Sequence, residues 1–261
     1  MPHEKLHSLL QLLDIGVRKD DIVRDNQTAV ARDSHYAAMF RADSETLLVN
    51  DHHYGVGREG GCWSGDSKAL LEIAWHTLGL LRISRSEVIR TKVYSEWHQG
   101  ADARRDTSGR LRGDQVLELT PVERGRVWTR FFRTVEGIPV WSSSFTLGLT
   151  ARGKIGFLLL HWPKLPEEAL KRAADLAKLV KDGFSPQNSK DVEKIRAVLL
   201  HSPAIGTCLE FVSCIRVEYK SAPGVGKLPV AYVSEGGTAI RVPTGLPELK
   251  TEVPLTRRNQ G

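Results

Sequence analysis

Three apolar segments separated by two tight turns occupy residues 126–162, and they constrain the fold more than any other part of the chain. The segments RVWTRFFRTV, IPVWSSSFTLGL and IGFLLLHW are rich in β-branched and aromatic residues, which favour strands. Gly137 lies in the first turn, and ARGK makes the second. Because short turns join neighbouring strands, this stretch predicts an antiparallel meander.

Helical periodicity appears on both sides of this meander. Residues 4–14, 68–81 and 165–183 repeat apolar side chains at helical spacing, and shorter helices are expected at 32–41 and 191–200. The capping residues agree, since Asp and Ser precede the second helix while Pro and Gly flank the third. The chain therefore mixes helices and strands, and no internal sequence repeat is evident.

The order of these elements predicts an α+β fold. A helix, the strand 89–98 and the three-stranded meander are ordered as in a cystatin-like unit, where the helix lies across a curved antiparallel sheet. This unit covers residues 66–164. Residues 1–65 are expected to add N-terminal helices and a glycine-rich loop. Residues 165–261 are expected to extend the fold with C-terminal helices and a strand pair, all packed as one domain.

Composition and charge argue against several classes of protein. The formal net charge of +6 comes from scattered Lys and Arg without a nucleic-acid motif, so no nucleic-acid partner is expected. Three cysteines without a Cys-x-x-Cys spacing predict reduced thiols rather than a disulfide framework. The first residues lack a secretory signal, and no apolar run approaches the roughly 20 residues of a membrane-spanning helix. We expect a cytoplasmic protein with no membrane partner.

Motifs for cofactors, metals and nucleophilic serines are missing. The nine histidines lack metal-ligand spacing, and a GxSxG motif is absent. The GxGxxG-like loop at residues 55–60 follows no clear strand of a βαβ unit. We therefore expect no metal, nucleotide or flavin.

The clearest candidate for chemistry is Glu96, within the strand predicted after the second helix. Alternation places Tyr94, Glu96 and His98 on one face of this strand. If that face pairs with the face of the next strand that carries Trp128 and Arg130, aromatic walls would surround a carboxylate and a cation. Such a cup suits a planar amine, and His98 would be a second acid or base beside Glu96.

A plainer interpretation of the same residues is also open. The face would be exposed to solvent, and Glu96 would pair with an Arg or Lys across the strands. Two further residues are candidates for ligand binding. Arg58 has glycines on both sides, and Ser202 lies where the predicted helix 191–200 gives way to a loop. A solvated loop residue and a helix end, respectively, would explain them as well.

One stretch of the chain resembles a known module. VEGIPVWSSSFTLGLTARGKIGFLLLHW is similar to the hairpin pattern of PepSY and thermolysin-propeptide domains. The resemblance covers about residues 66–163. It implies a ligand-binding or inhibitory module, which is one alternative for the function.

The layout of the whole chain, with Glu96 in a strand that ends in EWH, resembles the actinobacterial β-carboline-forming Pictet-Spenglerases. This resemblance implies the cofactor-independent condensation of L-tryptophan with an aldehyde, carried out by a homodimer. Glu96 would be the catalytic acid and base, removing protons and stabilising cationic intermediates. Another cofactor-free cyclase or isomerase that uses Glu96 is a further alternative.

The implied substrate site uses the other candidate residues. Arg58 or Arg130 would hold the substrate carboxylate. The indole would lie against Tyr94, Trp97 and Trp128. The aldehyde is not set by the sequence, because the size of the pocket depends on side chains that the pattern does not place.

Overall fold

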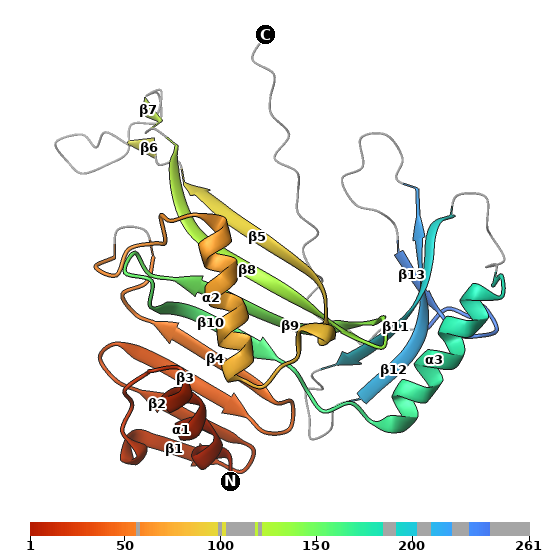
Figure 1. Ribbon diagram of the computed structural model, residues 1–261, viewed down its shortest axis with the longest axis horizontal. Helices are drawn as coiled ribbons and strands as arrows, with labels where there is room; N and C mark the ends of the chain where they lie inside the picture. Colours follow the sequence, from red (N-terminus) through yellow and green to blue (C-terminus); the bar gives the residue numbers. More distant parts are fainter. Residues whose placement is uncertain are drawn as a thin grey trace, which may run out of the picture.

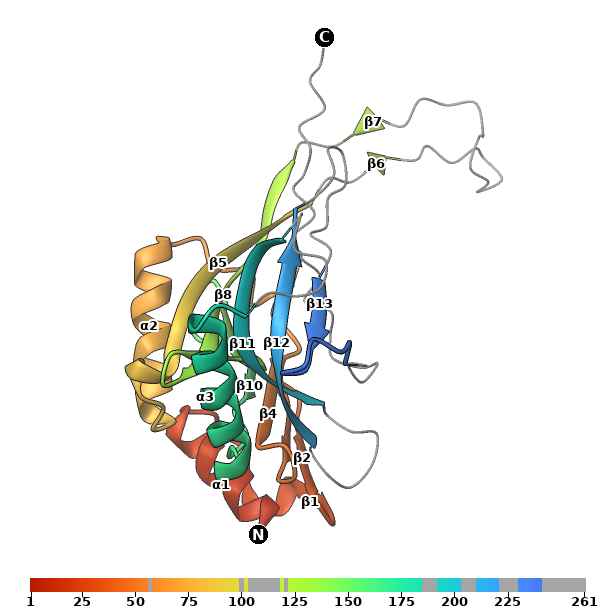
Figure 2. The same ribbon diagram turned by 90° about the vertical axis from the view of Figure 1, so that its right-hand side faces the viewer.

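The structure of the protein is a computed structural model that describes residues 1–55, 58–98, 101–102, 118–119, 122–184, 192–202, 210–220 and 230–240. In this part of the chain, three helices cover one side of an 11-stranded sheet (Figures 1 and 2). All strand pairs in that sheet are antiparallel except one. The α+β class predicted from the sequence is confirmed.

The first part of the chain is a helix followed by a four-stranded meander. Helix α1 (Pro2–Leu12) leads through the 3₁₀ turn Lys19–Asp21 into strands that pair in sequence order. Their bounds are β1 (Ile22–Asp25), β2 (Thr28–Arg32), β3 (Tyr36–Arg41) and β4 (Thr46–Asp51). The expected second helix of this region is therefore replaced by strands.

The middle part has the same order of elements. Helix α2 (Ser67–Leu80) and the 3₁₀ turn Arg85–Glu87 precede four longer strands. Their bounds are β5 (Val88–His98), β8 (Glu123–Val135), β9 (Ile138–Leu149) and β10 (Ile155–His161). Strand β10 also pairs with β4, which joins the two meanders into one sheet. The short strands β6 (Ala101–Asp102) and β7 (Glu118–Leu119) pair with each other.

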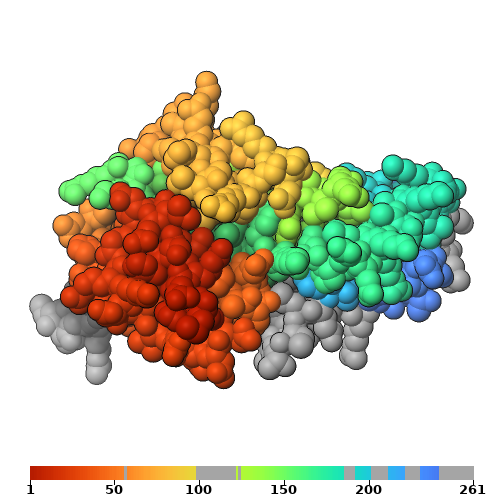
Figure 3. Space-filling view, turned by 60° about the horizontal axis from the view of Figure 1, so that its bottom comes forward, coloured from red at the N-terminus to blue at the C-terminus, as the bar shows by residue number. Residues whose placement is uncertain are grey.

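The last part is a third helix with its own meander. Helix α3 (Glu167–Lys181) precedes β11 (Val192–Ser202), β12 (Glu210–Tyr219) and β13 (Val230–Val233). Strand β11 joins the sheet through β9, where Leu199 and Val140 form the one parallel pair. Figure 3 shows the first and third parts at opposite ends of the molecule, with the middle part between them. The order helix-then-meander thus occurs three times, although the sequence shows no repeat.

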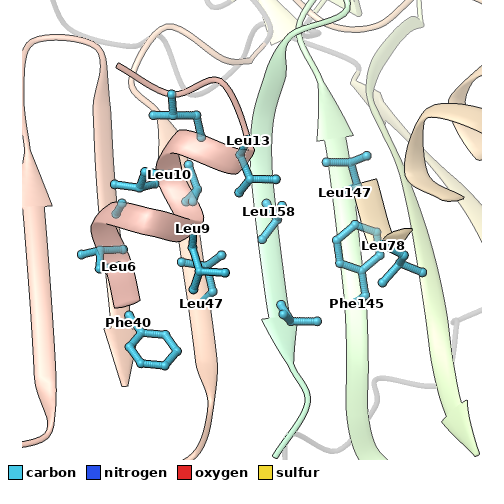
Figure 4. Close-up of a cluster of buried hydrophobic side chains, with 14 of the residues drawn as sticks. Leu6, Leu9, Leu10, Leu13, Phe40, Leu47, Leu78, Phe145, Leu147 and Leu158 are labelled. Atoms are coloured by element: carbon cyan, nitrogen blue, oxygen red, sulfur yellow. The ribbon is translucent and has the colours of Figure 1, made fainter. Parts of the chain in front are cut away.

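The helices are held by apolar side chains on the side of the sheet that faces them. Leu6 and Leu10 of α1 are fully buried in the cluster that contains Leu47, and Leu78 of α2 belongs to the same cluster as Phe145 (Figure 4). Burying each such side chain contributes about 1.5–3 kcal/mol. This cluster therefore fixes both helices on one side, as Figure 2 shows.

The opposite side of the sheet carries no helix in the described part of the chain, and we call it the open face. Its residues alternate with the core residues along each strand. Paired positions from β3 to β5 define it: Met39, Leu48, Leu159, Thr146, Arg130 and Lys92. The site described below lies on this face.

Two segments predicted as helices are strands. Residues 32–41 contain β3, where Phe40 is buried and Met39 only half-buried, as alternation in a strand requires. Residues 191–200 lie mostly in β11, which is buried on both faces along residues 197–200. The predictions were wrong because a short apolar run fits a buried strand as well as a helix.

Other local expectations are confirmed. Asp66 caps α2, since its Oδ1 accepts a hydrogen bond from the backbone N–H of Lys68 at 2.9 Å. The turn between β8 and β9 has positive φ at Glu136 (51°) and Gly137 (82°), as a two-residue hairpin turn requires. Helix α3 begins after Pro166.

Three sequence expectations concern the whole chain. No helix in the described ranges is long and apolar enough to cross a membrane. Cys62 and Cys214 are free thiols, whereas Cys208 lies outside the described residues. The limits between the three expected regions, at 65/66 and 164/165, stay a prediction.

Candidate functional site

Rows of paired side chains cross the open face, and one row brings aromatic residues together. Trp128 of β8 lies opposite Tyr94 of β5 on one side and Gly148 of β9 on the other. Gly148 in turn lies opposite Phe157 of β10. The face bearing Tyr94 therefore pairs with the face bearing Trp128, which is the pairing on which the predicted cup depends.

The loop between β4 and α2 brings Tyr54 onto this row. A Cβ atom added at Gly148 or at Gly156 would come within 2.5 Å of the Tyr54 side chain. The two glycines thus leave the space that the ring fills. Further along the loop, Trp63 packs against the core on the helix side, and its backbone N–H donates to the Leu149 carbonyl at 3.0 Å. The loop therefore wraps around the end of the sheet.

A cavity of about 150 Å³ lies beside Tyr54, and we call it the cup. One loop and four strands supply its lining: Tyr54, Glu96, Arg126, Trp128, Thr146 and Phe157. The ring of Tyr94 stacks on that of Trp128 at 5.9 Å between centroids, with 18° between the planes. Pockets that enclose whole small-molecule ligands measure about 300–1,000 Å³. The cup therefore has room for one chemical group of a ligand.

Glu96 forms an ion pair across the strands. Arg126 Nε donates a hydrogen bond to Glu96 Oε2 at 2.9 Å, with the side chains 29% (Glu96) and 46% (Arg126) exposed. The plainer interpretation of the sequence expected Glu96 to pair with an Arg or Lys across the strands, and the partner in the structure is Arg126. An ion pair with this exposure contributes at most about 1 kcal/mol to folding. A ligand can therefore exchange its own hydrogen bonds for this one at little cost.

Tyr54 is the buried polar group of the cup. Tyr54 is only 8% exposed, and its hydroxyl has no hydrogen-bond partner among the described residues. Burial raises the pKa of Tyr54 above its usual range; Cys62 and Glu96 raise it further, and Arg126 opposes them. The hydroxyl thus stays protonated and can donate. A buried polar group without a partner costs about 1–3 kcal/mol, which a ligand acceptor would recover.

Cys62 shares this electrostatic environment without lining the cup. Burial raises the pKa of the Cys62 thiol, Arg126 lowers it and Glu96 raises it. A raised pKa disfavours the thiolate, which is the nucleophilic form of cysteine. Cys62 is therefore a poor candidate for a nucleophile.

Arg130 lies one row away from the cup. Its Nη2 donates a hydrogen bond to Ser144 Oγ at 3.0 Å, and its guanidinium carbon lies 5.2 Å from the centroid of the Phe132 ring. Burial lowers the pKa of Arg130, with Tyr94 raising it and Arg90 lowering it. The cation of the cup is Arg126, and Arg130 belongs to a different group of side chains.

Among the described side chains, Tyr94, Arg58 and Trp97 also lie outside the lining of the cup. Arg58 is exposed on the loop. Trp97 is 57% exposed and follows a β-bulge that shifts the register after Ser95. The backbone of His98 ends β5 and that of Ser202 ends β11, while the side chains of both lie outside the described residues.

Four lining residues were not among the sequence candidates: Tyr54, Arg126, Thr146 and Phe157. Arg126 could have been found, because it lies two residues before Trp128 and so shares its face of β8. Tyr54 could not, since only the folded loop brings it onto the sheet. The alternation along a strand predicts which residues share a face, and it carries no information about what a distant loop places there.

A larger cavity of about 410 Å³ lies between the end of α1, the start of β3 and the loop after β4, and its lining carries four carboxylates together with Arg152 and Lys154. Asp33 Oδ1 accepts hydrogen bonds from the backbone N–H groups of His35 and Tyr36 at 2.7 and 2.6 Å, and Asp51 Oδ1 accepts one from His53 at 2.8 Å. These carboxylates stabilise turns. No group of three or more metal-binding side chains occurs in the described part of the chain.

Comparisons with known proteins assign no family. No protein-family model matches the chain, and no curated protein matches it. A solved structure of an uncharacterised protein from Eubacterium rectale is similar at 15% identity and a TM-score of 0.44, covering 92% of this chain and 82% of that one. The Bacillus megaterium YpeB C-terminal domain is similar at 10% identity and a TM-score of 0.36, covering 91% and 95%.

Proposed function

We propose that the protein is a ligand-binding module and that the cup receives one group of its ligand. The observation that carries this proposal is the buried Tyr54 hydroxyl, which has no hydrogen-bond partner among the described residues and borders a cavity with a carboxylate and a guanidinium. Neighbouring strands supply most of the lining. A site formed in advance on a sheet loses little entropy when it binds.

The middle part of the chain supports a cystatin-like or PepSY-like module. Helix α2 packs on the core side of four consecutive antiparallel strands, β5, β8, β9 and β10. This arrangement leaves the other side of the strands open to a ligand. Fold alone does not define function, so the chemistry of the cup has to define the ligand.

A planar carboxamide satisfies the polar groups of the cup. The Tyr54 hydroxyl and the Arg126 guanidinium donate hydrogen bonds, and the Glu96 carboxylate accepts them. A carboxamide offers a carbonyl acceptor and two N–H donors, and Trp128 and Phe157 give its flat faces apolar contacts. The proposed ligand is therefore a peptide that presents a glutamine or asparagine side chain to the cup.

Titration with short peptides that differ only in Gln, Glu or Ala at one position tests this function, with binding followed by NMR chemical shifts. Tyr54→Phe removes one hydroxyl, and Glu96→Gln removes one charge. We expect Glu96→Gln to weaken binding of the Gln peptide at least about tenfold, because hydrogen bonds with charged groups contribute about 1.5–3 kcal/mol. Tyr54→Phe should weaken it about threefold to tenfold, because a hydrogen bond between neutral groups contributes about 0.5–1.5 kcal/mol. Glu168→Gln, at an exposed position of α3, is the matched control. Equal affinity for the Gln and Ala peptides would refute the proposal.

A second proposal is the Pictet-Spengler condensation expected from the resemblance of the chain. It is supported by one observation, the presence of Glu96 beside the aromatic ring of Trp128 in a single cavity. Glu96 would remove protons from the tryptophan amine and from the indole carbon, while Trp128 and Tyr94 would accept the indole. The cup would have to widen to take tryptophan and an aldehyde together, because both exceed one chemical group.

Incubation of the protein with L-tryptophan and a panel of aldehydes, with β-carboline products followed by mass and fluorescence, tests the condensation. The proposal requires product above the protein-free control and a loss of at least about 100-fold in Glu96→Gln, the size of a general acid–base contribution. It also requires a homodimer, which sedimentation measures. Product formation unchanged in Glu96→Gln would remove Glu96 from the mechanism.

A further inference from the structure

Five cationic side chains form a second group on the open face, beyond the cup. We call them the arginine tract: Arg90, Lys92, Arg130, Arg196 and Arg216. Strand pairing brings the first three together, since Arg90 lies opposite Phe132 and Lys92 lies opposite Arg130. The other two pair with each other between β11 and β12.

The ring of Phe132 contacts two guanidinium groups. The Cζ atoms of Arg90 and Arg130 are 4.4 and 5.2 Å from the centroid of its ring. Arg90 is exposed, whereas Arg130 is half-buried and has a buried Nε with no hydrogen-bond partner in the described part of the chain. No carboxylate among the described residues forms an ion pair with either arginine.

Trp141 holds the second pair of guanidinium groups. The Cζ atoms of Arg216 and Arg196 are 4.1 and 4.9 Å from the centroid of its ring. Both arginines pair with the carboxylate of Glu218. Arg216 is only 7% exposed. The Nε atoms of both arginines are buried without a hydrogen-bond partner in the described ranges. One carboxylate therefore pairs with one buried cation, Arg216, and one half-buried cation, Arg196.

The two pairs act on one another electrostatically. Burial lowers the pKa of Arg216; the nearby Tyr232 raises it, while the charges of Arg196 and Arg90 lower it. Arg90 lies on β5 and Arg216 on β12, so the tract extends from the middle part of the chain to the third part. Among the described residues, the four arginines of the tract share one carboxylate, Glu218, so positive charge is in excess there. Such an excess in a partly buried place attracts anions.

The aromatic rings of the tract identify the kind of anion. Nucleic-acid bases bind to sheets by stacking on aromatic faces. Here guanidinium groups cover the rings of Phe132 and Trp141. Stacked guanidinium groups are held in place and keep planar sets of N–H donors, which match the oxygens of phosphates and carboxylates. The contacts therefore favour oxyanions over bases.

We propose that the arginine tract is a binding site for a small, multiply charged oxyanion, whose oxygens accept hydrogen bonds from guanidinium groups of the middle and third parts of the chain. The cations form two neighbouring pairs, so the site suits a compact molecule with two or more charged groups. Its charges are phosphates or carboxylates. This inference does not depend on the cup, which the ion pair Glu96–Arg126 leaves without excess charge.

Calorimetric titration at low ionic strength with pyrophosphate and with citrate tests the proposal and distinguishes the two sources. Binding of either anion supports it, and the tighter one shows whether the natural group is a phosphate or a carboxylate. Arg90→Gln is the diagnostic variant, because Arg90 is exposed and its loss leaves the core intact. We expect it to weaken binding about tenfold to 100-fold, the range for a charge-assisted hydrogen bond.

Arg172→Gln is the matched control, since it removes the same charge from the exposed surface of α3 on the other side of the sheet. It should leave the affinity unchanged, as should Glu96→Gln, which separates this site from the cup. Equal losses in Arg90→Gln and Arg172→Gln would show attraction by net charge alone and overturn the proposal. Binding of single-stranded nucleic acid without binding of either small anion would overturn it too.

Discussion

The His161 imidazole is partly buried, and its burial changes its pKa. It lies on the open face at the end of β10, where its Nδ1 is 2.6 Å from Thr46 Oγ1. Burial lowers the pKa of His161 to about 4; the charges of Arg133 and Arg41 lower it further, and Asp43 opposes them. The folded protein therefore holds this imidazole neutral under conditions where an exposed histidine is charged.

This burial predicts a loss of stability in mild acid. The unfolded chain, with a histidine pKa of 6.5, binds the proton more readily than the folded chain, so stability is complete above that value and falls as the pH drops towards 4. We expect the free energy of unfolding to fall by about 2 kcal/mol between about pH 7 and pH 4.5 because of this residue. Urea denaturation of the natural protein and of His161→Asn measures it. The exposed His76→Asn control should keep the full pH dependence.

The absence of a side chain at Gly148 leaves space for Tyr54, and this can be tested by substitution. A methyl group there would overlap the Tyr54 hydroxyl, so Gly148→Ala should cost about 1–3 kcal/mol, as overpacking does. In a Tyr54→Ala background the same change should cost much less, because the space is then free. Thermal unfolding of the four proteins gives the coupling. Equal costs in both backgrounds would mean that the ring does not occupy this space.

The residues in and beside the cup fall into two groups: those that strand alternation places together and one that a distant loop places there. Tyr94, Glu96, Trp128 and Arg126 follow from alternation on paired strands, so the sequence holds the information to place them together. Tyr54 reaches them from a loop, and its partners include a glycine that is unremarkable until the ring lies on it. Sequence analysis could predict the strand side of the cup, and the loop side needed the folded structure.

At the scale of elements, the start of α2 depends on one side chain. Asp66→Ala removes the oxygen that accepts from the Lys68 N–H, and we expect it to cost about 1 kcal/mol. Asp66→Ser keeps an acceptor at the same place and should cost much less. Chemical denaturation of both variants makes the comparison. Equal losses would show that the charge or the packing of Asp66 matters more than the cap.

End signals agree with the structure for the elements that the sequence predicted correctly, but they do not by themselves distinguish a helix from a strand. Asp66 begins α2, Pro166 precedes α3, and Gly137 turns β8 into β9. Residues 32–41 and 191–200 also begin with residues that can cap a helix, Asp33 and Asp191, yet these segments form β3 and β11. Their state is set by the neighbouring strands, because pairing with β2 and β4, or with β12, satisfies their backbone groups.

At the scale of the whole molecule, the third part is attached to the sheet mainly by side-chain packing on β9, because only one backbone pair joins them in the described ranges. One parallel pair, the apolar cluster with Leu199 and the packing of Trp141 against residues of β11 and β12 join it to β9. Leu199→Ala should cost about 2–5 kcal/mol and should speed hydrogen exchange in β11 and β12. Amides of β2 to β4 should keep their protection. A uniform loss across the sheet would show that the three parts unfold as one cooperative unit.

The turn at Glu136 and Gly137 has a consequence for how this protein can change during evolution. The turn sets the register between β8 and β9, and a slip by one residue would send every side chain of β8 to the opposite side. Phe131 would then meet water, while Trp128 and Arg130 would meet the leucines under α2. Two residues that contact no ligand thus decide whether the binding residues reach the surface at all, and substitutions there should be as damaging to binding as changes in the cup itself.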